Sequence, residues 1–383
     1  MRKLILCFLA FISIILIYKF VYLNPRNWYD HYRYLAQSFL AGRVDIPNLP
    51  TFYQDSLEYQ GKKYLPFPPV PALVLAPIIA VGKNTTQQQI SIIIGAINAI
   101  LVFLLLKKFT KPISALLLGI FFALGTVAFW SSVVGTTWYF AHNTALMFFL
   151  ISLMMFKNKK DFVSGVFFSL ASLCRLPIFL GIIFYFLELR KQRGRLISFL
   201  AGALLCIPIM FFYNWLRFGD IFHTGYLEIY KNYIEIDYPI SFLQSIYPNS
   251  PNFGYFDIRN IPLHIFTFFF LPPLIKGGVI VPSPYGMGIL FTTPLLLVAM
   301  IPPFRKGLEK NLLIGATLIA LVDFLHYMQG WVQFGYRFLL DFLPLLLIIL
   351  ALRFKLKIFY ILLLGISIAV NFWGVNWGVK LGW

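Results

Sequence analysis

Residues 161–191 read DFVSGVFFSLASLCRLPIFLGIIFYFLELRK, and this stretch decides the fold class. From Phe162 to Leu189 it is apolar over 28 residues, with basic clusters before and after it. A helix needs only about 20 residues to cross a membrane. Arg175 and Pro177 interrupt the run in its middle, and an arginine at mid-bilayer costs about 2.5–3.5 kcal/mol. We therefore predict two short half-helices that turn near Arg175, both ends of which lie on the cytoplasmic side.

Other apolar runs lie on both sides of this stretch, and nine of them are candidates for a full transmembrane helix. They are Leu4–Leu23, Ile90–Leu106, Ile113–Trp130, Tyr139–Phe156, Leu196–Tyr213, Gly288–Phe304, Asn311–Met328, Phe338–Leu352 and Ile358–Trp373. No small-residue cleavage site follows the first, so we expect a retained helix and not a removed signal peptide. The sequence predicts an all-α polytopic membrane protein with about nine full transmembrane helices plus a broken half-helix pair.

The composition of the whole chain agrees with this class. Of its 383 residues, 60% are hydrophobic and 12% are charged, whereas about 25% of a soluble domain is charged. Such a chain is too apolar to be disordered and argues against a water-soluble enzyme. We treat residues 1–383 as one membrane domain, because no soluble domain or repeat is visible.

The net charge of +18 does not indicate nucleic-acid binding. Most of the basic residues sit in short clusters between apolar runs, which is typical of cytoplasmic loops. No soluble segment carries a basic face with interleaved aromatic residues. If all the basic loops lie in the cytoplasm, the proline-rich run Pro68–Gly82 cannot cross the membrane and is expected at its outer interface. Segments 24–67 and 214–287 then lie outside the cytoplasm. The sequence therefore predicts polar chemistry on the outer face.

The first outer segment begins NWYDHYRYLAQSFLAG at residues 27–42. Its apolar residues recur at helical spacing, which predicts an amphipathic juxtamembrane helix at the membrane surface. Asp30 stands at the start of this helix, where it is either an N-cap or a functional carboxylate. Trp28, Tyr29 and Tyr32 offer surfaces on which a sugar could stack.

The same segment continues as YQDSLEYQGKKYLPFPP at residues 53–69. Asp55 and Glu58 are further outer carboxylates. Lys63, next to Tyr64, could contact a phosphate or simply reach lipid headgroups. Both interpretations stay open from the sequence.

Several ionisable residues lie within apolar runs, where they are costly and are usually functional or paired: His142, Arg175, Asp323, His326, Arg337 and Asp341. Spacing allows an Asp323–His326 pair and an Arg337–Asp341 pair. Alternatively, the planar guanidinium of Arg337, near Gln333, suits a lipid phosphate. Glu235 and Asp237 could bind a cation or form a solvated loop. No nucleotide-binding glycine motif is present.

These features together resemble the C-type glycosyltransferase superfamily, in particular protein O-mannosyltransferases and aminoarabinose-transferase-like membrane enzymes. The features are the first helix followed by an outer Asp, then PFPPVPALVLAP at 66–77, SLASLCRLP at 169–177 and FGYRFLLDFLPLLLI at 334–348. The mannosyltransferase members carry an Asp-Glu pair where this chain has Asp30-His31. That difference leaves the superfamily resemblance but weakens the mannosyltransferase assignment.

The resemblance implies a multi-pass cell-membrane enzyme that moves a sugar from a polyprenyl-phosphate carrier to an acceptor hydroxyl outside the cytoplasm, with inversion. It implies Asp30 as the catalytic base and basic residues near the carrier phosphate, namely Arg337, Lys63 and Arg175. Tyr64, His142, Gln333 and Tyr336 are the expected substrate-binding residues. The acceptor (glycan, lipid or protein) and the need for a divalent cation stay open. The alternatives are a lipid or solute transporter, which often has broken helices, and a polysaccharide polymerase or ligase.

Overall fold

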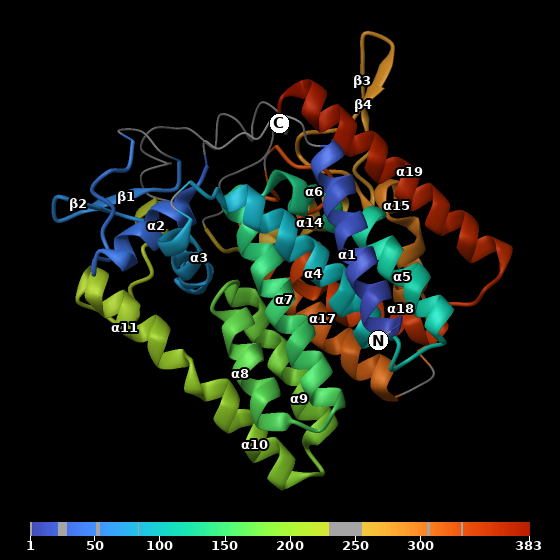
Figure 1. Ribbon diagram of the computed structural model, residues 1–383, viewed down its shortest axis with the longest axis horizontal. Coiled ribbons are helices and arrows are strands. Elements are labelled where there is room, and N and C mark those ends of the chain that lie inside the picture. Colours follow the sequence, from blue (N-terminus) through green and yellow to red (C-terminus); the bar gives the residue numbers. More distant parts are fainter. Residues whose placement is uncertain are drawn as a thin grey trace.

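The computed structural model describes residues 2–21, 29–50, 54–82, 84–229, 255–304, 307–330 and 332–383. Trp28 and the Glu235–Asp237 pair lie outside these ranges. Helices make up almost all of the regular structure, and two short antiparallel hairpins complete it (Figure 1). The hairpins are β1 (Leu57–Tyr59) with β2 (Lys62–Tyr64), and β3 (Leu274–Lys276) with β4 (Val279–Val281).

Four described helices are long and apolar enough to cross a membrane. They are α4 (Gln87–Leu106), α7 (Thr137–Lys157), α10 with α11 as one 26-residue span (Arg193–Phe218), and α19 (Ile358–Leu381). The pair α5 (Pro112–Leu124) and α6 (Val127–Val134) adds a fifth if it is counted as one span, although it bends by 52°. The helical membrane class is thus supported, whereas the predicted count of about nine spans is not confirmed.

The difference in count has local causes. The run 288–304 forms only α15 (Ile289–Thr292), a 3-10 turn at Pro294–Leu296 and α16 (Leu297–Met300). Pro294 cannot donate the backbone hydrogen bond that a continuous helix needs at this point. Helix α18 (Leu339–Arg353) has 15 residues and α17 (Gly307–Leu325) has 19, and α17 carries charged residues at its start. The runs 288–304 and 338–352 therefore do not form straight, full-length helices in the part of the chain that the structure describes.

The interrupted run around Arg175 is broken as the sequence predicts. Helix α8 (Asp161–Ser172) ends before Arg175, which has an extended backbone, and a 3-10 turn at Leu176–Gly181 leads into α9 (Ile182–Leu189). In Figure 1, α8 and α9 run beside each other near the start of α10 (Arg193–Leu205). The break places Arg175 at the end of the half-helices that points into the molecule.

Helix α18 forms the centre of the core. All of its residues from Leu339 to Ala351 are buried, including Asp341 and Pro344. Helices α7, α17, α4 and α5 pack around it. Because no side of α18 faces solvent, its one acidic residue, Asp341, needs hydrogen-bond or ion-pair partners inside the protein.

A smaller group of elements packs against the bundle at one side. Helix α2 (His31–Leu40) buries Tyr32, Leu35 and Ala36 and packs against α3 (Val70–Val81). The proline-rich run is therefore a single 12-residue helix, too short to cross a membrane. At the end of α11 (Ile207–Phe218), the guanidinium of Arg217 donates to the carbonyl of Leu65. This contact ties α11 to the segment that follows β2.

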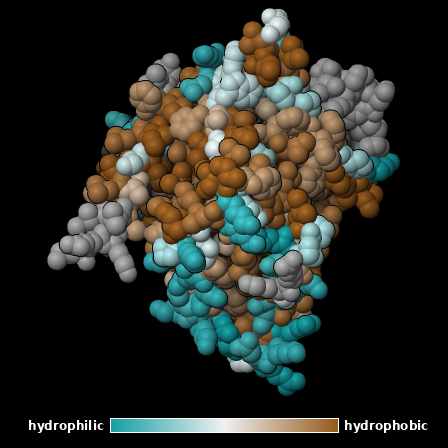
Figure 2. Space-filling view, turned by 90° about the vertical axis from the view of Figure 1, so that its right-hand side faces the viewer, coloured by the Kyte–Doolittle hydropathy of each residue, from teal (hydrophilic) through white to brown (hydrophobic). Residues whose placement is uncertain are grey.

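The surface has the polarity expected of a membrane protein. Figure 2 shows hydrophobic residues over most of one face and hydrophilic residues gathered at its lower end. The loop between α9 and α10 lies at that end in Figure 1 and carries Arg190 and Lys191. Helix α1 (Arg2–Val21) packs against α4, and the start of the chain lies at the lower end of α1 in Figure 1, well above the α9–α10 loop. The separation of apolar band and basic end fits the charge pattern of the loops.

Candidate functional site

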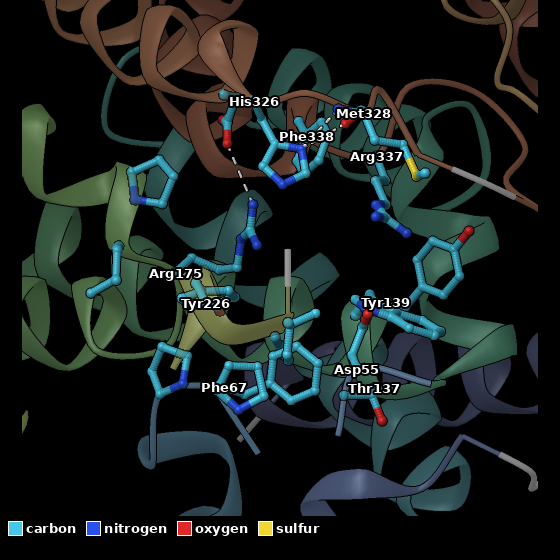
Figure 3. Close-up of a pocket in the computed structure, with 18 of the residues that line it drawn as sticks. Asp55, Phe67, Thr137, Tyr139, Arg175, Tyr226, His326, Met328, Arg337 and Phe338 are labelled. Atoms are coloured by element: carbon cyan, nitrogen blue, oxygen red, sulfur yellow. Dashed lines mark hydrogen bonds and ion pairs between the residues drawn. The ribbon is translucent and has the colours of Figure 1, made fainter. Parts of the chain in front are cut away.

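A cavity of about 770 Å³ lies where the helix bundle meets the smaller group of elements around α2 and α3. Its wall combines the residues around Asp55, the start of α7, the break at Arg175 and the segments that flank α17 and α18. Apolar and aromatic side chains form most of this wall (Figure 3). A pocket of this size, with few polar groups, is typical of a site for a small molecule or a lipid headgroup.

Arg175 is held in the cavity wall by two buried carboxylates from different helices. Its Nε donates to Asp341 Oδ2 at 3.0 Å, and its Nη2 lies 2.9 Å from the same oxygen and 3.4 Å from Asp323 Oδ1. Behind it, Asp341 Oδ1 lies 2.7 Å from His142 Nδ1. Buried charges persist only when they are paired in this way. The positive charge of Arg175 is thus balanced inside the protein.

Arg337 lines the same cavity in a different electrostatic setting. Its guanidinium faces the rings of Phe338 at 5.2 Å and Trp138 at 5.9 Å, and lies beside the Tyr139 side chain (Figure 3). No carboxylate of the described residues comes within ion-pair distance of it. Aromatic faces compensate such a cation only in part. Arg337 therefore offers the cavity a positive charge that can bind an anion.

Asp55 is a carboxylate that lines this cavity beside the start of α7. The indole nitrogen of Trp138 donates to its Oδ2 at 2.8 Å. Its φ is 60°, in the left-handed region, where Asp is tolerated better than most residues. The turn at residues 54–55, just before β1, thus places a carboxylate beside the start of α7.

His31 fixes the backbone next to Asp55. Its Nε2 lies 2.6 Å from the carbonyl of Gln54, and its Nδ1 lies 2.7 Å from Thr137 Oγ1. A carbonyl only accepts, so Nε2 carries the proton and donates. Burial lowers the pKa of His31 to about 3, so the ring is neutral. One imidazole thereby connects α2, the Asp55 turn and α7.

Asp30 occupies the N-cap position of α2, but its side chain makes no capping hydrogen bond. It is 6% exposed and lies 3.7 Å from Arg33, and it is not among the residues that line the cavity. Burial raises its pKa to about 6, against the lowering effect of Arg33. Its neighbours Tyr29 and Tyr32 do line the cavity. The role of Asp30 as the base stays a prediction.

The structure brings together two of the predicted site residues, Arg175 and Arg337, and none of the other six lines the cavity. Lys63 Nζ contacts the Leu49 carbonyl at 3.3 Å, and Tyr64 packs on Phe218. His142 is buried against Asp341.

The remaining two predicted residues support segments near Arg337. Gln333 is fully buried and donates to the carbonyls of Tyr285 and Gln329, while its Oε1 accepts from the backbone N–H of Arg337. The hydroxyl of Tyr336 lies 2.7 Å from His264 Nδ1. These five residues could position the cavity but do not face it.

Both ion pairs considered from spacing are wrong. Asp341 pairs with Arg175 and His142, and not with Arg337. His326 Nδ1 lies 2.8 Å from the Met328 carbonyl, and Asp323 turns to Arg175. The spacing rule holds only inside a helix. Arg337 precedes α18, which starts at Leu339, and His326 follows α17, which ends at Leu325.

Sequence reasoning missed part of the cavity wall. Trp138, Tyr226, Tyr255 and His326 all line it, although they come from four distant segments. Only His326 carried a signal, as an ionisable residue in an apolar run. Within the described residues, no three His, Cys, Asp or Glu side chains gather as metal ligands.

Comparisons with known proteins support the fold. The chain is similar to the crystal structure of the oligosaccharyltransferase of Archaeoglobus fulgidus tethered to an acceptor peptide with the NVT sequon, with a TM-score of 0.51 and 16% identity. For the apo form of that enzyme the TM-score is also 0.51, at 14% identity. Each alignment covers 97% of this chain and 55% of the other, so the chain spans about half the length of that enzyme.

No protein-family model matches the sequence, and no curated protein matches it. At this level of identity the likeness shows the fold alone. The family resemblance seen in the sequence therefore stays an expectation.

Proposed function

We propose that this chain is an integral membrane glycosyltransferase that moves a sugar from a polyprenyl-phosphate donor to an acceptor hydroxyl on the extracytoplasmic face. The observation that carries the proposal is the guanidinium of Arg337, which lines a largely apolar cavity and has no ion-pair partner among the described carboxylates. A phosphate ester on a lipid chain has the complementary properties, an anion attached to an apolar tail. The shared fold with an oligosaccharyltransferase supports the same class of enzyme.

In this proposal the acceptor oxygen attacks the anomeric carbon while the bond from that carbon to the carrier phosphate oxygen breaks. The acceptor proton passes to a carboxylate, and the phosphate leaves on the carrier with its charge stabilised by Arg337. One displacement inverts the configuration at the anomeric carbon, by the logic that applies to glycosidases. No nucleotide site is needed for this donor.

Two carboxylates compete for the role of the base. Asp55 lines the cavity and is oriented by Trp138, whereas Asp30 is the position that the family resemblance implies. We favour Asp55, because a base must come within hydrogen-bond reach of the hydroxyl that it deprotonates. Asp30 can serve only if α2 or the Asp55 turn moves when substrates bind.

The test is incubation of the purified protein with polyprenyl-phosphate sugars of different kinds and with candidate acceptors. Release of sugar-free carrier phosphate, with and without EDTA, is the readout. We expect release with one class of sugar, and the EDTA arm decides whether a divalent cation takes part. Binding of the donors without any release in the presence of acceptors would instead favour a transporter.

A further inference from the structure

The two arginines of the cavity differ in how much charge they offer a ligand. Arg175 uses Nε and Nη2 for Asp341 and Asp323, and the Asp341 carboxylate at 2.9 Å balances its charge. Its remaining nitrogen, Nη1, donates to no residue that the structure describes, although Arg175 lines the cavity. A phosphate near Arg175 would meet a guanidinium whose charge Asp341 already balances, and would be repelled by that carboxylate. A neutral group that accepts a hydrogen bond would not.

His326 presents the complementary group to the same space. Its Nδ1 lies 2.8 Å from the Met328 carbonyl, which can only accept, so this nitrogen carries the proton of the neutral ring. The Met328 N–H, 3.2 Å from the same nitrogen, could donate to it only in the other tautomer, and we assign the proton by the shorter contact, to the carbonyl. In Figure 3 the other ring nitrogen points toward the open centre of the cavity. That nitrogen, Nε2, has a free lone pair and no partner among the described residues.

We propose that Arg175 Nη1 and His326 Nε2 form a subsite for two neighbouring hydroxyls of the transferred sugar, separate from the phosphate subsite at Arg337. This inference rests on the proposed function and adds to it a division of the cavity. A hydroxyl both donates and accepts. The donor of Arg175 can therefore bind one hydroxyl oxygen, while the acceptor of His326 takes the proton of the next.

The aromatic wall around His326 fits a sugar. The ring of Tyr255 meets His326 edge-on at 5.0 Å, and Phe338 lies 6.0 Å from His326 and 5.4 Å below the Arg175 guanidinium. Such faces suit the apolar C–H surface of a sugar ring, while the two polar groups bind its hydroxyls. Asp341 and Asp323 fix the direction of Arg175, so its free N–H is held ready for the ligand.

The test compares binding of bare decaprenyl phosphate with decaprenyl phosphate that carries mannose, glucose, galactose or arabinose. We expect wild-type protein to bind one glycolipid more tightly than the bare carrier. His326→Phe keeps an aromatic ring and removes the hydrogen-bond acceptor. It should lower the affinity for that glycolipid by about 3- to 10-fold, the range of one net hydrogen bond. The affinity for bare carrier should stay within about twofold.

Deoxy analogues of the preferred glycolipid identify the hydroxyl. One analogue should bind wild-type protein as weakly as the parent glycolipid binds His326→Phe, and it should lose nothing further in that variant. Arg175→Lys keeps the positive charge beside both aspartates but removes the planar guanidinium. It should lower the affinity for the glycolipid through the hydroxyl next to the one that His326 binds. His223→Phe is the matched control, since His223 packs on Phe218 and does not line the cavity.

Three results would overturn the subsite. The wild-type protein could bind glycolipids and bare carrier equally well, or His326→Phe could lower the affinity for glycolipid and bare carrier by the same factor, or it could leave both affinities unchanged. In each of these cases the phosphate role of Arg337 can still hold, because the bare carrier binds. Failure of the wild-type protein to bind any of these lipids would instead reject the proposed function itself, and the subsite with it.

Discussion

Arg175 donates from Nε to Asp341 Oδ2 at 3.0 Å, across 166 positions of the sequence. The contact joins the break between two half-helices to the most buried helix of the core. It takes Asp341 away from Arg337, which is only four positions before it and was one of the partners that the spacing allowed. As a result, Arg175 is paired with a buried carboxylate, whereas Arg337 has none within ion-pair distance among the described residues.

Removing Asp341 should therefore destabilise the protein strongly. Asp341→Ala leaves Arg175 and His142 without their shared carboxylate in a buried site, and breaking a buried pair costs about 3–5 kcal/mol. Denaturant unfolding in detergent measures the loss. The control is Asp257→Ala, which breaks the exposed pair with Arg259 and should cost less than about 1 kcal/mol. Similar losses in both variants would contradict the importance of the buried cluster.

Arg337 should bind the lipid phosphate. Arg337→Gln removes the charge and should weaken decaprenyl phosphate by at least about 10-fold, since hydrogen bonds to charged groups are worth about 1.5–3 kcal/mol. Arg337→Lys should recover part of the affinity, because an ammonium cannot make two parallel bonds. Lys63→Gln serves as the control, because Lys63 lies outside the cavity and contacts the Leu49 carbonyl. Unchanged binding in Arg337→Gln would remove the basis of the proposed function.

The base can be identified by two isosteric changes. Asp55→Asn keeps a side chain that tolerates the left-handed backbone and can still accept from Trp138, but it cannot take up the acceptor proton. We expect sugar transfer to fall by about 100- to 10,000-fold with normal folding. Asp30→Asn should change transfer by much less. The reverse order of effects would assign the base to Asp30 and would require α2 or the Asp55 turn to move during the reaction.

Asp30 should also leave a signature in the pH dependence of stability. Its pKa is raised from 3.8 to about 6 by burial, so the folded protein holds its proton more tightly than the unfolded chain does. Ionised Asp30 is thus unfavourable in the fold, and its contribution to stability falls as the pH rises from about 4 to about 6. Asp30→Asn should melt above wild type at pH 8, and the difference should vanish near pH 4.

The neighbouring Asp45 gives the opposite sign as a control. Its hydrogen bonds from Arg43 lower the pKa of the Asp45 carboxyl, so the ionised form stabilises the fold. Asp45→Asn should therefore melt below wild type at pH 8, with the difference lost in acid. If Asp30→Asn behaved like Asp45→Asn, the burial of an unfavourable charge at Asp30 would be disproved.

The orientation in the membrane follows from the basic loops and can be tested by labelling. A cysteine at exposed Glu58 should react with an impermeant thiol reagent added to intact cells, whereas one at Lys159 should react only after lysis. The background is a chain in which Cys7, Cys174 and Cys206 are replaced by Ala. Reaction of both positions from the same side would contradict the predicted topology.

The sequence by itself determined the class of the protein and several of its elements. Apolar run lengths and loop charges are local quantities, so they were enough to predict a helical membrane chain. Arg175 and Pro177 likewise predicted the break between α8 and α9, because a proline and a charged residue disrupt a membrane helix at their own position in the sequence. The amphipathic α2 was predicted from its spacing for the same reason.

Only the tertiary structure decided which of the ionisable residues face the cavity. Ion pairs and cavity walls depend on distances between segments far apart in the chain, and no local pattern contains these distances. Asp323 and Asp341 could reach Arg175 only because α17 and α18 both pack beside the broken segment. Asp55 reaches the cavity because His31, Trp138 and Thr137 hold its turn against α7, whereas Asp30, at the more suggestive position, turns to Arg33.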